Sequence, residues 1–576
     1  MRGKILIAGL FVFLLASAGC RPGPSTQLSG ERQTGARGGR LIVADRSAPQ
    51  SFSCLVAGDG TSLTIGFFVM CARLVEFDHD KQQFVPGLAE SWQANEGGKV
   101  VTIKLRDGLK FSDGAPLTAD DVLFTIQILS DPKLHPPAFY DAVLIDGKPV
   151  KASKVDDRTI KLELPRTVAA IESWLYSIGV LPRHKLEAAY KKGEADKMWG
   201  LAAAPADFAV TGPFTLKEYV AGQRTILTRN EHYWKKDAKG NQLPYLDELV
   251  IEAISDPNTA ILKFQNGELD VLDNIRPQDY ASLKDKPGPV AVHDLGPRLQ
   301  TDFFWFNLND GKDAAGQPLV DPVKRAWFTD VRFRKAIAQA IDRPGIIQNV
   351  LRGLGTPLKG AVSPGNKFWV NDNIPAYEYD VKKAQDLLKE AGFKLNGSSL
   401  ADAAGHPVEF TLIVAENETV RKQMATIMQE DLARLGIKVN VSPMEDKAFL
   451  EFIRKSLTYE AAIHGASPTD TDPTTMSGVL KTGGQQRFWF MNEKQAATEW
   501  EKKLDQLMEE QGFESEVNKR REKFNEAQRI FADQLPMIPL VVRHFVTGSK
   551  TNLGNYRSSV ITPRSLWNVD ELFWKK

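Results

Sequence analysis

"FVPGLAESWQANEGGKVVTIKLRDGLKFSDGAPLTADDVLFT", residues 84–125, ends with three aspartates close together, Asp113, Asp120 and Asp121, which could hold a metal ion or carry acid–base chemistry. The first precedes a glycine, a pair typical of tight turns because glycine adopts positive φ and aspartate hydrogen-bonds the local backbone. Thr118, three residues before Asp121, predicts a capping box at the start of a helix. A calcium loop would need alternating oxygen ligands and a closing bidentate acid, which this spacing lacks. We therefore expect the aspartates to shape a turn and a helix start.

The bulk composition indicates a globular chain with more than one lobe. Its 576 residues are too many for one hydrophobic core. The hydrophobic content of 42% and the charged content of 25% are ordinary for a soluble globular protein. The net charge is +1 at pH 7 and no basic tract stands out, so the electrostatic pattern of a nucleic-acid-binding protein is missing.

The N-terminal stretch MRGKILIAGLFVFLLASAGC has the layout of a secretory signal: basic residues, an apolar run, then small residues. The apolar run is too short to span a bilayer comfortably as a permanent helix. Its end, SAGC, resembles the bacterial lipobox, although Ser17 stands where leucine is usual. We therefore predict a signal peptide over residues 1–19, a lipid on Cys20 that anchors the protein to a membrane, and a flexible tether over 20–39. A plain signal peptide with an incidental cysteine is the alternative.

Cys54 and Cys71 are the other two cysteines of the chain. In an exported protein two cysteines usually pair, and a disulfide closing a loop of this size would stabilise the fold by about 3 kcal/mol. A zinc site is the alternative, but no His or Cys pair at ligand spacing lies near them in the sequence. We therefore predict a Cys54–Cys71 disulfide and no metal.

The pattern of elements changes along the chain. Alternating apolar residues in the first half predict strands over residues 41–43, 100–105, 158–164 and 224–230. After about residue 320, helical spacing predicts helices over residues 330–342, 380–391 and 418–435, and one long helix over 499–533. Glycines separate several of these helices from strands, an order typical of α/β layers with a mixed or parallel sheet. Because strand patterns dominate the first half and helical patterns the second, we predict two lobes with a cleft between them. Two independent domains are the alternative, but no disordered linker separates the halves.

Enzyme motifs are scarce in this chain. There is no GxGxxG opening a βαβ unit, no GxxxxGK[ST], no HExxH and no GxSxG. An SxxK match at residues 130–133 contains Pro132, which would end the preceding helix, so we interpret it as a stop signal. The eight histidines are scattered without neighbouring ligands. We therefore expect no catalytic residues, no metal and no cofactor.

Several stretches in a fixed order resemble one known family. Residues 84–125 match its Pro-Gly-Leu-Ala-x-Ser-Trp motif, a strand pair and Phe-x-Asp-Gly-x-Pro-Leu-Thr-Ala-x-Asp-Val. Further matching segments are TGPFTLKEYVAGQRTILTRNEHYW, ILKFQNGELDVLD, FTDVRFRKAIAQAIDRPGIIQNVLRG, YDVKKAQDLLKEAGF and LPMIPL. On these segments the chain is similar to the family 5 extracellular solute-binding proteins, the peptide- and oligopeptide-binding components of ABC importers.

The resemblance implies an α/β, two-lobed periplasmic-binding-protein-like fold with an extra N-terminal subdomain, two hinge strands and a ligand cleft between the lobes. It places lobe I at residues 40–304 with the subdomain at roughly 72–205, lobe II at 305–540, and a C-terminal return to lobe I at 541–576. It further implies a monomer in the periplasm or on the outer face of the cell membrane. This monomer would deliver peptides to the permease subunits of an ABC importer, without catalysis.

Two aromatic stretches are candidate walls of the ligand site. TDFFWFNLN, residues 301–309, falls at the first expected hinge, and RFWFMN covers residues 487–492. Successive side chains of a strand point to opposite faces. Phe304, Trp305 and Trp489 therefore either contact the ligand or fill a strand that is buried on both faces.

HGASPTDTDP, residues 464–473, aligns with a cleft loop that reads Gly-Trp-x-x-Asp in many peptide binders of the family. The resemblance implies that Asp470, or alternatively Asp472, pairs with the α-ammonium of a peptide; a purely structural turn before Pro473 is the other interpretation. The tryptophan is replaced around Ser467, and two loops are longer than in compact peptide binders, so an oligosaccharide is the alternative ligand. A secreted hydrolase is the competing class, but the sequence suggests no nucleophile–base pair. A signalling receptor on the same fold is a third possibility.

Overall fold

The computed structural model describes residues 31–53, 55, 59–134, 144–145, 147–466, 468, 470–491 and 493–576. The predicted signal peptide, Cys20, Cys54 and Ser467 lie outside the described residues, so the lipid anchor and the disulfide stay predictions. Cys71 is buried, with 3% of its surface exposed. Among the described helices, none has the length and apolar content needed to cross a membrane.

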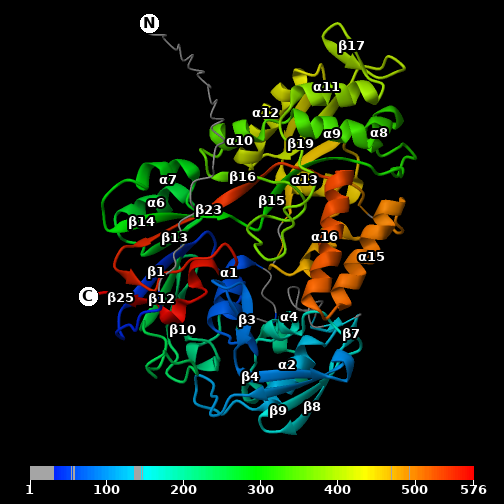
Figure 1. Cartoon of the computed structure of the whole chain (residues 1–576). Coiled ribbons are helices and arrows are strands. Elements are labelled where there is room, and N and C mark those ends of the chain that lie inside the picture. Colours follow the sequence, from blue (N-terminus) through cyan, green and yellow to red (C-terminus); the bar gives the residue numbers. More distant parts are fainter. Residues whose placement is uncertain are drawn as a thin grey trace, which may run out of the picture.

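A mixed eight-stranded sheet forms the centre of lobe I (Figure 1). Its order is β10 (Phe214–Val220), β11 (Arg224–Arg229), β12 (Glu248–Ala253), β1 (Arg40–Asp45), β13 (Val271–Asp273), β23 (Val541–Lys550) and β14 (Val290–Pro297), with β16 (Gly355–Pro357) paired to β23. β1 is parallel to β12 and to β13, so the carboxyl ends of these three strands meet at one edge of the sheet. Helices α6 (Pro257–Gln265) and α7 (Pro277–Leu283) share a buried cluster with β13 and β23.

A separate four-stranded antiparallel sheet forms the subdomain at the bottom of Figure 1. Its order is β4 (Ala89–Asn95), β5 (Val100–Leu105), β9 (Thr159–Glu163) and β8 (Lys151–Asp156). The helices of this region are α2 (Ala119–Leu129), α4 (Ile171–Tyr176) and α5 (Arg183–Lys191). The strands predicted over residues 41–43, 100–105, 158–164 and 224–230 are thus confirmed as β1, β5, β9 and β11.

The three clustered aspartates have the structural roles predicted for them. Thr118 caps α2, and the Asp121 carboxylate accepts a hydrogen bond from the Thr118 backbone N–H at 2.9 Å, which completes a capping box. Asp113 accepts from the backbone N–H two residues on at 3.1 Å, and Gly114 has a φ of +88°. Asp120 forms an exposed ion pair with a lysine of β8 at 2.8 Å. The stretch therefore shapes the subdomain.

Lobe II is built on a five-stranded sheet. Its order is β20 (Lys438–Met444), β19 (Glu409–Ala415), β21 (Ala461–Ala466), β15 (Thr301–Phe306) and β22 (Ile538–Pro539). Its helices include α8 (Pro322–Thr329), α9 (Val331–Ala340), α10 (Arg343–Asn349), α11 (Val381–Glu390) and α12 (Thr419–Ala433). Asp380 caps α11 through the Lys383 N–H at 3.0 Å. β19 is parallel to both β20 and β21, whereas β15 is antiparallel to β21 and β22, so of the predicted mixed or parallel sheet the mixed form is present.

The chain passes between the two large sheets at two neighbouring places. β14 of lobe I continues through residues 298–300 into β15 of lobe II, and β22 of lobe II continues through Leu540 into β23 of lobe I. β14 pairs with β23, and β15 pairs with β22, so the two crossings lie side by side. Two short parallel connections of this kind permit one lobe to rotate against the other.

The prediction of one continuous helix over residues 499–533 was wrong. The structure has two helices, α15 (Glu499–Phe513) and α16 (Val517–Gln534), which lie side by side at the right of Figure 1. The first ends just after Gly512, and glycine disfavours a helix interior by about 1 kcal/mol. The reversal lets apolar side chains of both helices, such as Leu504 and Phe531, enter one core.

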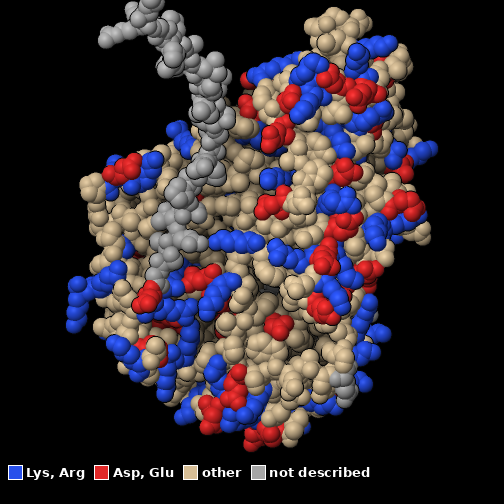
Figure 2. All heavy atoms as spheres, in the orientation of Figure 1, with Lys and Arg blue, Asp and Glu red and all other residues tan. Residues whose placement is uncertain are grey.

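The last part of the predicted tether is held against the folded protein. Arg32 forms an ion pair with Glu571 at 2.8 Å, and the Gln33 backbone N–H donates to Asn555 at 2.8 Å. Residues 32 and 33, within the segment predicted as a flexible tether over residues 20–39, therefore contact the folded protein. Over the face in Figure 2, acidic and basic side chains are interspersed, in keeping with the balanced net charge.

Candidate functional site

A buried carboxylate links the two lobe connections through hydrogen bonds to arginines. Asp302, on β15, is 2% exposed. It accepts from Arg421 Nε of α12 at 2.9 Å, and from Arg543 Nε and Nη2 of β23 at 2.8 and 3.0 Å. Glu418 adds contacts to both arginines, at 3.3 Å to Arg421 and 3.5 Å to Arg543. The network therefore joins the first crossing, the second crossing and the start of a lobe II helix.

The positive charges of the neighbouring arginines determine the protonation states of Asp302 and His464. Burial alone would raise the pKa of Asp302, but Arg543 and Arg421 outweigh it and hold that pKa below its ordinary value. His464 lies 3.3 Å from Arg421, and burial together with that positive charge lowers the pKa of His464 to about 3. Asp302 is therefore ionised and His464 neutral at physiological pH.

The loop after β21 carries the two aspartates predicted as ligand contacts. Asp472 is engaged within the protein: its two oxygens accept from Arg520 Nη1 and Nη2 at 2.7 and 2.6 Å. It also caps the short helix Pro473–Met476 by accepting from the Thr474 N–H at 2.9 Å. This bidentate geometry is typical of strong charge-assisted pairs. Asp472 therefore has the structural role that the turn interpretation described.

Asp470 has a different environment. One of its oxygens accepts from the Asp472 backbone N–H at 2.7 Å, and no lysine or arginine of the described chain pairs with it. Burial, and then the neighbouring charge of Asp472, raise the pKa of Asp470 to about 7, against a smaller opposing effect of Arg520. An acid without a cation in a poorly solvated place favours a positively charged ligand group.

An aromatic wall of lobe I lies near Asp470. Tyr176 has Phe77 and Phe84 around it, with ring centroids 6.3 and 5.8 Å away, and Arg73 lies over its ring at 5.0 Å. Burial raises the pKa of Tyr176 to about 12; Arg73 opposes this, and the charges of Glu76 and Asp470 add to it. The two lobes approach each other here: Gln82 Nε2 donates to the Gly365 carbonyl at 3.3 Å, and Asn366 Nδ2 donates to the Thr471 carbonyl beside Asp470 at 2.8 Å. No signal in the sequence pointed to this wall, because Phe77 and Phe84 lie about a hundred residues from Tyr176 in the chain.

The lobes also touch at the end of the helical pair. Arg166 of the subdomain forms an ion pair with Glu509 of α15 at 3.3 Å, and the Ala169 N–H donates to the Gly512 carbonyl at 3.2 Å. Figure 1 shows α15 and α16 reaching down to the subdomain near α4. The two lobes are thus in contact far from the strand connections.

The predicted aromatic ligand contacts lie in the core of lobe II. Phe304, Trp305 and Trp489 each have 0% of their surface exposed. Trp305 stacks on Phe488 at 5.1 Å between centroids and donates from Nε1 to the Tyr459 hydroxyl at 3.0 Å. All six residues of β15 are buried because strands lie on both sides of it and helices on both faces. This conformation gives a ligand no access to these three rings.

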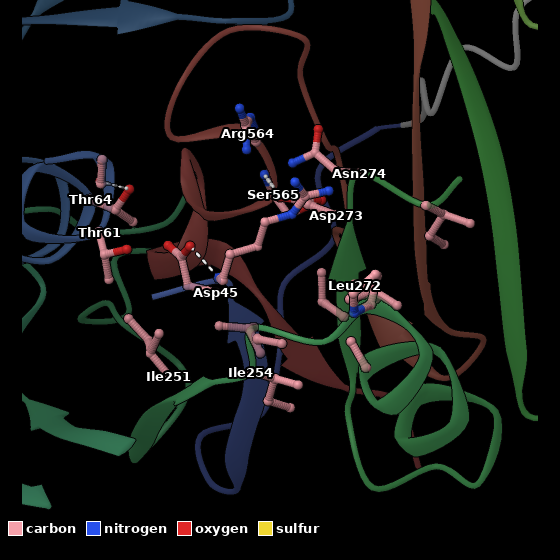
Figure 3. A pocket seen from close by; sticks show the side chains of 18 of the residues that line it. Asp45, Thr61, Thr64, Ile251, Ile254, Leu272, Asp273, Asn274, Arg564 and Ser565 are labelled. Atoms are coloured by element: carbon pink, nitrogen blue, oxygen red, sulfur yellow. Dashed lines mark hydrogen bonds between the residues drawn. The ribbon is translucent and has the colours of Figure 1, made fainter. Parts of the chain in front are cut away.

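A pocket of about 250 Å³ opens in lobe I at the carboxyl ends of β1, β12 and β13 (Figure 3). Its apolar side consists of Ile251, Ile254 and Leu272, whereas Asp45 and Arg564 are among its polar side chains. Ligands of open α/β sheets bind at such carboxyl edges. The pocket is therefore part of the candidate site, and sequence reasoning did not find it.

One triad of side chains has the arrangement of a hydrolase. Thr356 Oγ1 lies 2.8 Å from His544 Nε2, and His544 Nδ1 lies 2.9 Å from Asp294 Oδ2. The three residues sit on the neighbouring strands β16, β23 and β14, and Thr356 and His544 are not among the residues that line the pocket of Figure 3. We interpret the triad as a tie between strands. Within the described residues, no three His, Cys, Asp or Glu side chains are grouped to hold a metal ion.

Two lobes joined by two adjacent strands, with a carboxyl-edge pocket and contacts between the lobes, define a two-lobed periplasmic binding protein. The chain belongs to the bacterial extracellular solute-binding proteins, family 5, whose model matches residues 83–488. The family prediction is confirmed.

Individual relatives agree with this assignment. A protein of Deinococcus radiodurans named "Probable ABC transporter-binding protein" is 31% identical over 62% of this chain and 61% of its own length. The oligopeptide-binding protein AppA of Bacillus subtilis is 26% identical over 99% of this chain and 98% of its own. The structure of AppA in complex with a nonapeptide has a TM-score of 0.67, with 25% identity, and covers 94% of this chain and 100% of that one. These relatives are all named as binding proteins.

Proposed function

We propose that this protein is the peptide-capturing component of an ABC importer: it closes its lobes on a peptide and delivers it to a membrane permease. The observation that carries the proposal is Asp470, an acid with no cationic partner among the described residues, whose charge adds to the raised pKa of Tyr176 on the opposite lobe. An α-ammonium is the cation that every peptide with a free N-terminus offers. A charge-assisted hydrogen bond to it would stabilise the ionised carboxylate.

Closure would follow from contacts that exist only when both lobes touch the ligand. A ligand shifts a conformational equilibrium only by its differential affinity for the two states. Asp470 lies on lobe II and Tyr176 on lobe I, so a ligand that contacts both residues would bridge the lobes. A peptide bound between them would therefore favour the closed state, in which the permease could recognise the paired lobes.

Native mass spectrometry of the purified protein tests the ligand class. We expect co-purified peptides, which a mild denaturation step releases and fragmentation identifies. A bound glycan would support the oligosaccharide alternative and contradict the peptide proposal. Cleavage of the bound molecule during incubation would contradict the assignment as a binding protein.

The N-terminal sequence supports a further part of the proposal, a lipid anchor on Cys20 outside the cytoplasm. Replacing Cys20 with alanine removes the thiol that the lipid would modify, so we expect most of the protein to move from the membrane fraction to the soluble fraction. Fractionation and immunoblotting of both forms measure this. Unchanged membrane retention would contradict the lipoprotein assignment.

The contact between Arg166 and Glu509 gives a prediction about closure. The change Arg166→Glu puts like charges across the lobes, and exposed pairs contribute about 0.2–1 kcal/mol. We expect the affinity for the co-purified peptide to fall about two- to fivefold, measured by isothermal titration calorimetry. The matched control is Lys382→Glu, at an exposed pair within α11. If both variants bind equally well, the Arg166 contact is not part of the closed state.

A further inference from the structure

The acidic groups of the lobe I pocket already have donors. Asp45 accepts from the Arg46 backbone N–H at 2.7 Å. Asp273 accepts from the Thr547 hydroxyl at 2.7 Å and from the Ser565 hydroxyl at 2.5 Å. A third acid of the lining, Asp279, is paired with Arg276 at 2.5 Å. These carboxylates are therefore engaged in holding the walls.

Two of the three arginines that line the same pocket are not engaged in this way, whereas the third, Arg276, is the partner of Asp279. Arg46 and Arg564 both line it, and neither guanidinium has an ion pair or hydrogen bond with another described residue. The Arg564 guanidinium lies over the Phe545 ring at 5.4 Å, and its charge opposes the rise that burial causes in the pKa of Asp45. In Figure 3 the Arg564 side chain stands on the polar side, opposite Ile251 and Ile254. Each guanidinium carries five N–H donors in a planar fork that suits carboxylates.

Another arginine, Arg298, lies in the connection between the two lobes. Arg298 lies between β14 and β15, its Nε is buried without a hydrogen-bond partner, and Nη2 donates to the His544 carbonyl at 3.0 Å. Burial lowers the pKa of Arg298 to about 10; Arg543 adds to this, Asp302 opposes it, and Arg564 and Arg46 add smaller effects. The unused donors of the pocket and the buried Nε of Arg298 therefore belong to one region in which the arginine charges act on one another.

We propose that this region is a subsite for an anionic end of the ligand, the C-terminal carboxylate of a peptide, with the last side chain against the apolar side of the pocket. This inference rests on the proposed peptide function and adds the polarity of the bound ligand. The ammonium end lies at Asp470 on lobe II and the carboxylate end at Arg46 and Arg564 on lobe I. A peptide that reaches both would bridge the lobes, so both charged ends contribute to closure.

The test compares two pools of random tri- to pentapeptides, one with free C-terminal carboxylates and one amidated, by native mass spectrometry of the intact protein. Hydrogen bonds to charged groups predict roughly tenfold greater retention of the carboxylate pool. Arg46→Gln and Arg564→Gln should each remove that preference. Arg46 is exposed, so its replacement leaves the fold intact. The matched control Arg529→Gln, on the exposed side of α16, should keep it.

Thermal unfolding with inorganic phosphate at constant ionic strength tests the anionic subsite independently of peptide binding. Phosphate should raise the thermal midpoint of the parent and Arg529→Gln proteins but not of Arg46→Gln. If neither peptide pool is retained while phosphate still acts through Arg46, the anionic subsite stands and the peptide function fails. Equal retention of both pools, or a preference that survives in Arg46→Gln and Arg564→Gln, overturns the subsite.

Discussion

Replacing Asp302 with asparagine should destabilise the protein by about 3–5 kcal/mol, the cost of leaving buried charges without their partner. Arg421 and Arg543 would keep their positive charges at the lobe connection with only Glu418 to balance them. Urea unfolding measures the loss through the midpoint and slope. Asp386→Asn, which removes an exposed pair within α11, is the matched control and should cost no more than about 0.5 kcal/mol.

The pH dependence of this difference has a defined sign. The pKa of Asp302 is lowered in the folded protein, so its stabilising contribution is present above its unfolded pKa, about 3.9. It is lost as the pH falls through the still lower folded pKa. The gap between parent and Asp302→Asn should therefore be full at pH 6 and shrink in strong acid. A loss below about 1 kcal/mol at pH 6 would contradict the role of Asp302 as the tie between the two crossings.

Replacing Asp470 with asparagine should have the opposite effect on stability. The folded pKa of Asp470 is raised to about 7, so ionising it in the folded protein is unfavourable. As the pH rises from about 4, the unfolded value, towards 7, the parent protein loses stability that the asparagine variant keeps. Each pKa unit corresponds to about 1.36 kcal/mol, and water at the half-buried side chain screens part of the charge. We expect Asp470→Asn to be more stable by roughly 2 kcal/mol at pH 8 and equal at pH 4.

The same variant should bind peptides less well. Loss of a charge-assisted hydrogen bond to the α-ammonium would weaken binding by roughly ten- to a hundredfold, whereas N-acetylated peptides should bind both proteins alike. Calorimetry at pH 8 measures affinity, and thermal unfolding across pH measures stability. Asp472→Asn is a useful contrast, since it strips Arg520 of its partner and should destabilise the protein. A variant Asp470→Asn that is less stable at pH 8, with unchanged affinity, would contradict the ligand role.

Capping residues and the spacing of apolar residues predicted many of the helices and strands. The capping box at Thr118 and the cap at Asp380 depend on residues three apart, so they could be predicted from the chain itself. The reversal between α15 and α16 could not, because helical spacing looks the same on both sides of a sharp turn. The change in periodicity near residue 320 predicted two lobes with a cleft, and the family motifs added which two-lobed fold they form.

The site was harder to predict. Trp305 and Trp489 are aromatic and near the lobe connection, but whether a strand is buried on both faces depends on helices far away in sequence. Arg46, Arg298 and Arg564 come from three distant segments, and their unused donors are visible only when the neighbouring carboxylates are seen to be occupied. Of the predicted ligand contacts that the structure describes, only Asp470 has an environment in keeping with that role.

Small-angle X-ray scattering with and without peptide tests most directly whether this protein closes its lobes on a ligand. The ligand-free protein and the protein saturated with the peptides identified by mass spectrometry are measured at the same concentration. We expect the radius of gyration and the largest intramolecular distance to decrease on peptide binding, and to stay unchanged with a pool that does not bind. Saturated binding with no change in either quantity would contradict capture by closure between the two lobes.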